Sequence, residues 1–375
     1  MLSGGRLFSN LPISLIASIA LALSPSPGAL LYAQQKPTQE NQNLAQEKIG
    51  PAAPAAVLPQ TEQSEAQPGI KIERTHEDFT TLGLVGSDLV ATTPFQGGHE
   101  TNKDFVRDLY QVQWRTNDPI DLFIIRPVGA KNPPVVLYLF SFPGDTKRFL
   151  DANYCKRLVS NGTAAVGFVS ALTGDRYTHR PMKQWFISEL QESLASTSHD
   201  VQMILNYLES RGDLDMSRVG IFGQGSGGAI AILAASVDPR IKALDLIGPW
   251  GDWPDFLAEA KGIPPQEKPN FAKPEFLKKL EPLEPVRYLP DLKTQSLRIH
   301  IMDEDPPTKW AVRVEKAAPA GAEIHRYASA EDLHADSASG KLFQWIANKL
   351  KPAVETNAPA LTQSPETTKN QGATR

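Results

Sequence analysis

The sequence has very little cysteine: one residue, Cys155, in a chain of 375. A single thiol excludes an internal disulfide framework and any zinc site built on cysteines, because both need at least two. Cys155 falls inside a predicted helix, so we interpret it as a small core residue rather than a nucleophile. The seven histidines show no His-x-x-x-His or His–carboxylate spacing that suggests a metal site. The sequence therefore predicts neither a metal nor a cofactor.

An excess of positive charge is missing as well. The formal net charge at pH 7 is −4, from 38 basic and 42 acidic residues. Proteins that bind nucleic acids usually carry a basic patch, so this balance argues against a nucleic-acid partner. The chain has only one long apolar stretch, at its N-terminus, which argues against a protein that crosses a membrane several times. What remains is a globular protein with a small-molecule substrate or ligand.

The apolar stretch runs from Leu11 to Leu23, behind the basic Arg6 and within residues 1–33. This order resembles a secretory signal peptide. Leu31 stands where a small residue is usual before the cleavage site, so an uncleaved N-terminal anchor is the alternative. Both interpretations predict an exported protein, which is periplasmic, secreted or tethered to a membrane by this segment.

Two segments without aromatic residues flank the rest of the chain. Residues 34–71 are rich in Gln, Pro and Ala, and residues 352–375 are rich in Thr, Asn, Gln, Ala and Pro. Such segments bury too little apolar surface to order themselves, so we predict a disordered linker and a disordered tail. Residues 72–351 then form one large domain, which is long enough for a single core.

Strand and helix patterns alternate through this domain. The segments 110–114 and 120–125 predict a hairpin, because a turn of Asn, Asp and Pro separates them. The runs 135–140 and 164–169 are apolar without alternation, as expected of strands covered on both faces. Further strands are predicted over 218–222, 241–247, 296–302 and 323–327, and helices over about 149–161, 200–211, 229–235, 310–317 and 340–350. This alternation predicts an α/β protein with a mainly parallel, doubly wound sheet.

The strongest chemical signal is the run Gly223-Gln224-Gly225-Ser226-Gly227-Gly228. It follows a predicted strand and precedes a predicted helix, which is the setting of a nucleophile elbow. Here the sequence resembles the α/β-hydrolase family, most closely its peptidase and esterase members, over residues 105–350. The resemblance implies a doubly wound sheet of the α/β-hydrolase type, with the proline-rich residues 249–290 as a small inserted cap. It also implies a serine hydrolase that acts on a carboxylic ester or a related acyl bond.

Two registers of the elbow stay open. The residues two positions before and after the turn residue must be small, because strand and helix approach closely there. With Ser226 at the turn, Ser226 is the nucleophile, but Gln224 replaces the first small residue. With Gly225 at the turn, both flanking residues are glycine, and Ser226 supplies only a backbone N–H to the oxyanion hole. A third interpretation, a phosphate-binding loop, is weaker because the segment lies far from a first βαβ unit.

By the same resemblance, the acid and base of a catalytic triad come later in the chain. Asp305, or Asp303 as the second choice, lies in the turn after the strand 296–302 and would orient the histidine. His334 lies in a predicted loop before the last helix and would carry the proton between the serine and the leaving group. The alternatives are an ordinary Asp-Pro turn and an exposed loop histidine.

The resemblance also implies an oxyanion hole made of backbone N–H groups. One would come from Phe142, in the loop after the strand 135–140, and the other from Gly227 if Ser226 is the nucleophile. Two functions therefore stay open. The first is a serine hydrolase, and the second is a non-catalytic protein of the same fold, with Gly225 at the nucleophile position, that binds a ligand or a partner.

A cluster of aromatic residues follows the strand 241–247. Trp250, Trp253 and Phe256 lie there, at the end of the strand where open α/β sheets bind ligands. We expect either an aromatic wall of a substrate pocket or the base of the cap, packed on the core.

Overall fold

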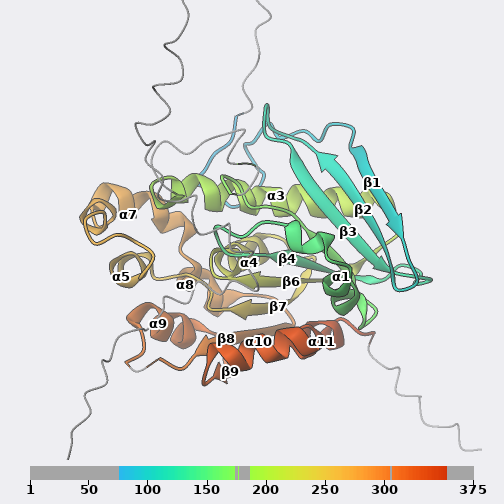
Figure 1. The fold of residues 1–375 in the computed structure, drawn as a ribbon. Helices are drawn as coiled ribbons and strands as arrows, with labels where there is room; N and C mark the ends of the chain where they lie inside the picture. The colour runs from blue at the N-terminus through green and yellow to red at the C-terminus, as the bar shows by residue number, and fades with distance from the viewer. Residues whose placement is uncertain (1–75, 174–175, 177–185, 305, 353–375) are drawn as a thin grey trace, which may run out of the picture.

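The computed structural model describes residues 76–173, 176, 186–304 and 306–352, which Figure 1 shows in colour. The predicted signal peptide or anchor (1–33), the linker (34–71) and all of the tail after its first residue lie outside the described residues. In the part that is described, no helix is long and apolar enough to cross a membrane.

A mixed sheet forms the centre of the molecule, with its strands in the order β1-β2-β3-β5-β4-β6-β7-β8-β9. The pairs β1–β2, β2–β3 and β3–β5 are antiparallel. All the following pairs in this order, from β5–β4 to β8–β9, are parallel. The prediction of a mainly parallel α/β sheet is confirmed. The strands are β1 (Phe95–Thr101), β2 (Phe105–Val112), β3 (Ile120–Pro127), β4 (Pro134–Leu139), β5 (Ala164–Gly167), β6 (Asp215–Gln224), β7 (Ile241–Ile247), β8 (Ser296–Met302) and β9 (Glu323–Tyr327).

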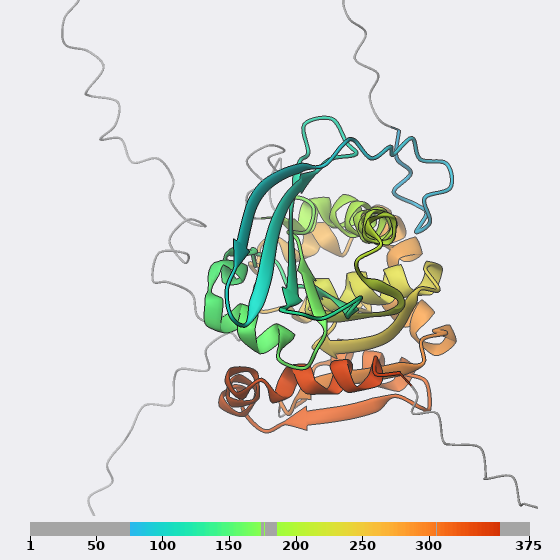
Figure 2. The same ribbon diagram turned by 90° about the vertical axis from the view of Figure 1, so that its right-hand side faces the viewer.

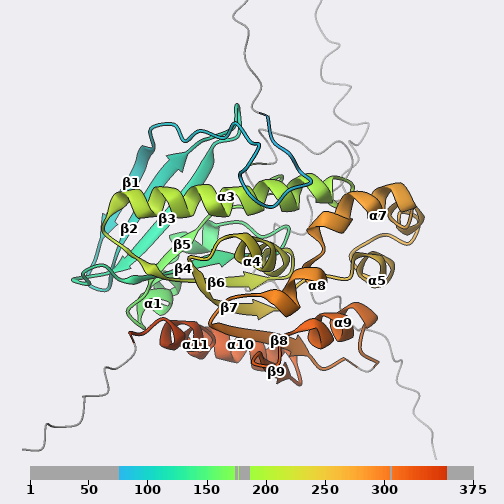
Figure 3. The same ribbon diagram turned by 180° about the vertical axis from the view of Figure 1, so that it is seen from behind.

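Helices cover both faces of this sheet. α1, α10 and α11 lie on the face seen in Figure 1, and α3 and α4 lie on the face seen in Figure 3. Each layer of helices closes an apolar core of its own against the sheet. The helices are α1 (Ala152–Val159), α3 (Leu190–Arg211), α4 (Ser226–Val237), α5 (Trp253–Glu259), α6 (Lys268–Phe271), α7 (Pro274–Leu280), α8 (Pro285–Tyr288), α9 (Lys309–Ala317), α10 (Ala330–Ser339) and α11 (Lys341–Lys349).

Strand β1 is an addition that the sequence does not predict. Its side chains are mostly exposed, and a register shift between Gln96 and Gly98 interrupts its pairing with β2. Two glycines and a polar composition hide the usual strand pattern. Figure 2 shows β1, β2 and β3 curving away from the parallel strands at one edge, with β9 at the opposite edge.

The insertion between β7 and β8 is helical. It contains α5 to α8, of which α7 packs against α3 and α8 packs against α4. Four of its prolines stand in the first turn of an α-helix, where a missing N–H costs little, so they begin helices rather than break them. They are Pro254, Pro269, Pro274 and Pro285.

Helix α3 begins at Leu190, ten residues before the predicted start at Asp200. Serines and a threonine in its first half hide the helical pattern, because these residues usually favour caps and turns. In the structure they are buried and hydrogen-bonded: Ser193 Oγ donates to the Ala171 carbonyl (2.9 Å), and Thr197 Oγ donates to the Ser193 carbonyl (2.6 Å). The helix ends as predicted, with Gly212 in the left-handed conformation.

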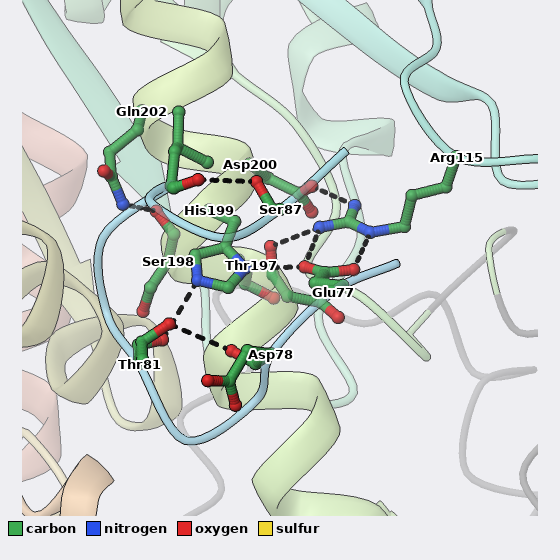
Figure 4. A network of polar contacts seen from close by, with 12 residues as sticks. Glu77, Asp78, Thr81, Ser87, Arg115, Thr197, Ser198, His199, Asp200 and Gln202 are labelled. Atoms are coloured by element: carbon green, nitrogen blue, oxygen red, sulfur yellow. Dashed lines mark hydrogen bonds and ion pairs between the residues drawn. The ribbon is translucent and has the colours of Figure 1, made fainter. Parts of the chain in front are cut away.

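A buried ionic network fixes the segment 76–92 to the outer side of α3 (Figures 3 and 4). Glu77 accepts two hydrogen bonds from Arg115 (2.6 Å each) and one contact from His199 Nδ1 (2.6 Å). Arg115 also pairs with Asp200, which is fully buried. We call this set, which also includes Arg176 and Asp118, the Asp200 network.

The Asp200 network makes stability depend on pH. Burial alone would raise the pKa of Glu77 and of Asp200, but the neighbouring cations outweigh it and hold both pKa values below their ordinary range. A carboxyl whose pKa is lower in the folded state stabilises that state above its unfolded pKa, and this contribution is lost as the pH falls. We expect the free energy of unfolding in urea to fall steeply below about pH 4. A Glu77→Gln variant should show a shallower fall, and an equally steep fall would contradict this assignment.

Candidate functional site

The sharp turn between β6 and α4 has Gly225 at its centre. Its backbone angles are φ 54° and ψ −116°, which glycine adopts at no steric cost and other residues adopt only under strain. Hydrogen bonds fix the turn on both sides, because the Gly225 N–H donates to the Ile247 carbonyl (2.9 Å) and its carbonyl accepts from the Trp250 N–H (3.1 Å). Gly225 therefore takes the position of the turn residue.

The flanking glycines explain why the backbone follows this register. A Cβ on Gly223 would lie 2.8 Å from the Gly227 carbonyl oxygen, and a Cβ on Gly227 would overlap the carbonyl oxygen of Leu139. The small residues that the elbow needs are thus two positions before and two positions after Gly225. Ser226 is the first residue of α4 and not the residue at the turn.

No space is left for a side chain at position 225. A Cβ built on Gly225 would overlap Ser141 Oγ, lie 2.8 Å from Ser141 Cβ and lie 3.2 Å from Trp250 Nε1. Real Cβ atoms essentially never lie as close as 2.8 Å to such neighbours. Ser141 therefore occupies the volume in which the first atom of a nucleophile side chain would stand.

With Gly225 at the turn, an oxyanion would be bound by two backbone N–H groups, and each of them donates a hydrogen bond to a serine hydroxyl. The Phe142 N–H donates to Ser226 Oγ (2.9 Å), and the Ser226 N–H donates weakly to Ser141 Oγ (3.4 Å). Ser226 is only 1% exposed. The donors expected of an oxyanion hole are thus present, but each already has an acceptor from within the chain.

His334 lies in helix α10, so the prediction that places it in a loop is wrong. Ser329 caps the start of this helix by accepting a hydrogen bond from the Asp332 N–H (3.1 Å), and Gly340 ends it in the left-handed conformation. A capped helix forms here because the segment has both end signals. Leu333 is buried on the side that faces the sheet, whereas His334 beside it is exposed.

The predicted acid lies in the turn after β8. Asp305 is outside the described residues, and Asp303 is exposed and accepts a hydrogen bond from Arg326 (3.2 Å). Of the predicted site residues that are described, the structure brings Ser226 and Phe142 into direct contact, and Gly227 follows Ser226 in α4. No hydrogen bond between described residues joins His334 to them.

The aromatic cluster after β7 belongs largely to the core. Trp253 and Phe256 are buried, and Trp253 Nε1 donates to the Leu283 carbonyl (2.9 Å). The rings of Trp250 and Phe256 lie 4.6 Å apart, and Trp250 reaches the turn at Gly225. Sequence reasoning missed the contribution of Trp250 and Ser141 at this turn, since neither lies near Gly225 in the sequence.

The chain after Trp250 is held by a half-buried carboxylate. Glu284 accepts hydrogen bonds from the backbone N–H groups of Asp252 (2.8 Å), Trp253 (2.8 Å) and Val286 (3.1 Å). Burial raises the pKa of Glu284, and these hydrogen bonds only partly oppose it. This carboxylate positions backbone, and none of these contacts involves Gly225 or Ser226.

A second histidine–carboxylate pair is buried beneath α11. His300 Nε2 lies 2.7 Å from Asp245 Oδ1, and Arg298 donates to both oxygens of Asp245 (2.8 and 2.7 Å). Both residues are buried, two positions before the carboxyl ends of β7 and β8, and their contact links these neighbouring strands. Among the described residues, no group of three or more side chains is arranged to hold a metal ion.

Comparisons with known proteins identify the fold. No family model and no curated protein sequence matches the chain. An acetyl xylan esterase from Paenibacillus sp. R4 is similar in structure, with a TM-score of 0.52 and 18% identity over 68% of this chain and 88% of that chain. The acylaminoacyl peptidase of Pyrococcus horikoshii matches with a TM-score of 0.52 and 15% identity, over 68% of this chain and 44% of that chain. The chain has the α/β-hydrolase fold, which confirms the resemblance seen in the sequence.

Proposed function

We propose that this α/β-hydrolase-fold protein does not use a serine nucleophile and instead acts by binding a small-molecule ligand or a partner. One observation carries the proposal: the elbow turn is occupied by Gly225, and Ser141 fills the space of the missing side chain. Covalent hydrolysis needs a side-chain nucleophile next to a base, and position 225 supplies none. A fold shared with hydrolases does not itself imply hydrolysis.

Two further features support this proposal. The backbone donors at Phe142 and Ser226 are engaged by serine hydroxyls, whereas an oxyanion hole needs donors that are free to meet the developing charge. His334 is exposed on α10, and no hydrogen bond between the described residues joins it to Ser226. A proton carrier must lie within hydrogen-bond reach of the hydroxyl that it activates.

A serine hydrolase acting on a carboxylic ester or related acyl bond is the competing function. The similarity in fold to an acetyl xylan esterase favours it. Ser226 would then attack, His334 would accept its proton and Asp305 would orient His334. The turn would have to move first, because Ser226 is 1% exposed and bonded to Phe142. The apolar residues 11–23 support the proposal that either function is performed by an exported protein.

Reaction with a fluorophosphonate probe separates the two functions. We expect no covalent label on the folded chain, because the turn has no nucleophile and Ser226 is buried. The readout is the intact mass, followed by peptide mapping, with an active serine esterase as the positive control and a thermal unfolding transition as proof of folding. A label on Ser226 that disappears in His334→Ala would overturn the proposal in favour of the hydrolase.

A further inference from the structure

Among the arginines that the structure describes, two near helix α1 lack the ionic partner that the others have. Each of the other arginines among the described residues lies within 4 Å of a carboxylate. Arg148, in the short 3-10 helix Lys147–Leu150, and Arg157, in the last turn of α1, form no such pair within the part of the chain that the structure describes. Both side chains are half-buried, so two cations stand close to the protein interior without a neutralising charge.

The aromatic residues beneath these arginines hold them in place. The Arg148 guanidinium stacks over the Phe140 ring at 3.7 Å, and the Arg157 guanidinium lies 5.6 Å from the centre of the Tyr154 ring. Tyr154 and Arg157 are three residues apart and so share one face of α1. Cation–π contacts fix the position of a guanidinium but leave its N–H groups available for hydrogen bonds.

Unsatisfied polar atoms gather at the same place. Among the described residues, Arg148 Nη1 and Arg157 Nε are buried without a hydrogen-bond partner, and the buried Tyr154 hydroxyl has none besides the Arg148 guanidinium. Tyr154 is only 6% exposed. Burial raises the pKa of Tyr154 to about 12, and both arginines act against this rise, which places both charges near the phenol. The hydroxyl therefore keeps its proton at neutral pH and is a donor.

We propose that Arg148, Arg157 and Tyr154 form a binding site for a tetrahedral oxyanion of the phosphate or sulfate type. Guanidinium groups bind such anions through paired, charge-assisted hydrogen bonds, and a phenol adds a neutral donor. An anion would give the unsatisfied buried donors an acceptor, which native structures almost always provide. This site lies on the 3-10 helix and on α1, which follow the Phe142 loop, and the proposal does not depend on the function assigned to the turn at Gly225.

Calorimetric titration of the full chain with inorganic phosphate tests this site. We expect saturable binding, which Arg148→Gln or Arg157→Gln weakens by about tenfold, because each removes charge-assisted hydrogen bonds. Sulfate should compete with phosphate, whereas acetate at equal ionic strength should not. Failure of phosphate to bind, or binding that acetate abolishes equally, would overturn the proposal.

Matched variants separate a built site from general positive charge. Lys147→Gln removes the same charge from the same 3-10 helix, but Lys147 is exposed and already paired with Asp145. Phosphate binding should survive this change, and an equal loss would contradict the site. Tyr154→Phe keeps the packing and should weaken binding by about threefold without lowering the unfolding temperature. That variant keeps the test decisive if an arginine variant fails to fold.

Discussion

Replacing Gly225 with alanine is expected to lower the free energy of unfolding by about 3 kcal/mol. Two costs add in this change. The new residue must adopt a positive φ of 54° with ψ near −116°, which alanine rarely does. Its Cβ must also displace Ser141, which packs against the same point. Urea unfolding of the purified chain, followed by circular dichroism, measures the difference.

A double-mutant cycle with Ser141→Gly separates the steric cost from the backbone cost. Removing the Ser141 side chain clears the overlap but also removes the acceptor of the Ser226 N–H, so the single variant should itself cost about 1 kcal/mol. We expect Gly225→Ala to cost about 1 to 2 kcal/mol less in the Ser141→Gly background than in the natural chain. Additive costs would show that Ser141 does not fill the volume of the missing side chain.

The cycle also bears on function. If Gly225→Ala proves neutral in the natural chain, the turn has room for a nucleophile side chain and the case for a binding protein loses its main support. If the cost and the coupling are both found, the turn is built around glycine. Ser141, which accepts a hydrogen bond from the Ser226 N–H, then occupies the volume that a nucleophile side chain at position 225 would take.

The elbow shows what the sequence predicts and what it does not. The need for small residues on both sides of the turn is local, so the spacing of Gly223 and Gly227 already favours Gly225 as the turn residue. The filling of the turn is not local, because Ser141 lies 85 positions before Ser226. No pattern near the elbow identifies which distant side chain closes it.

The same distinction separates the correct elements from the missed ones. Apolar strands such as β4 and β7 are read directly, since both faces of each are covered by helices. The first half of α3 is polar and its pattern does not predict a helix, because its serine and threonine hydroxyls are satisfied by Ala171, which lies 22 to 26 positions earlier in the chain. His334 was expected in a loop for a related reason: the family resemblance gives its position along the chain, whereas the caps of α10 decide its conformation.

Replacing Asp200 with alanine is expected to cost about 4 kcal/mol of unfolding free energy. Asp200 is fully buried in the middle of α3 and accepts hydrogen bonds from Trp114 Nε1 (2.7 Å) and from Arg176 (2.8 Å), besides its pair with Arg115. Removing one member of a buried ionic network leaves the opposite charges without compensation, which costs far more than the intact network contributes. Urea unfolding at neutral pH measures the loss.

A surface pair provides the matched comparison. Glu315 pairs with the half-exposed Arg326, so Glu315→Ala should change the unfolding free energy by less than about 1 kcal/mol. A similar effect from Asp200→Ala and Glu315→Ala would show that water reaches the Asp200 network. A large difference would show instead that Glu77, which meets Arg115 and His199, docks the segment 76–92 onto α3 through charges shielded from water. In that case Glu77→Ala should destabilise the whole domain and not the N-terminal segment alone, because the groups that it leaves unpaired lie in the turn between β2 and β3 and on α3.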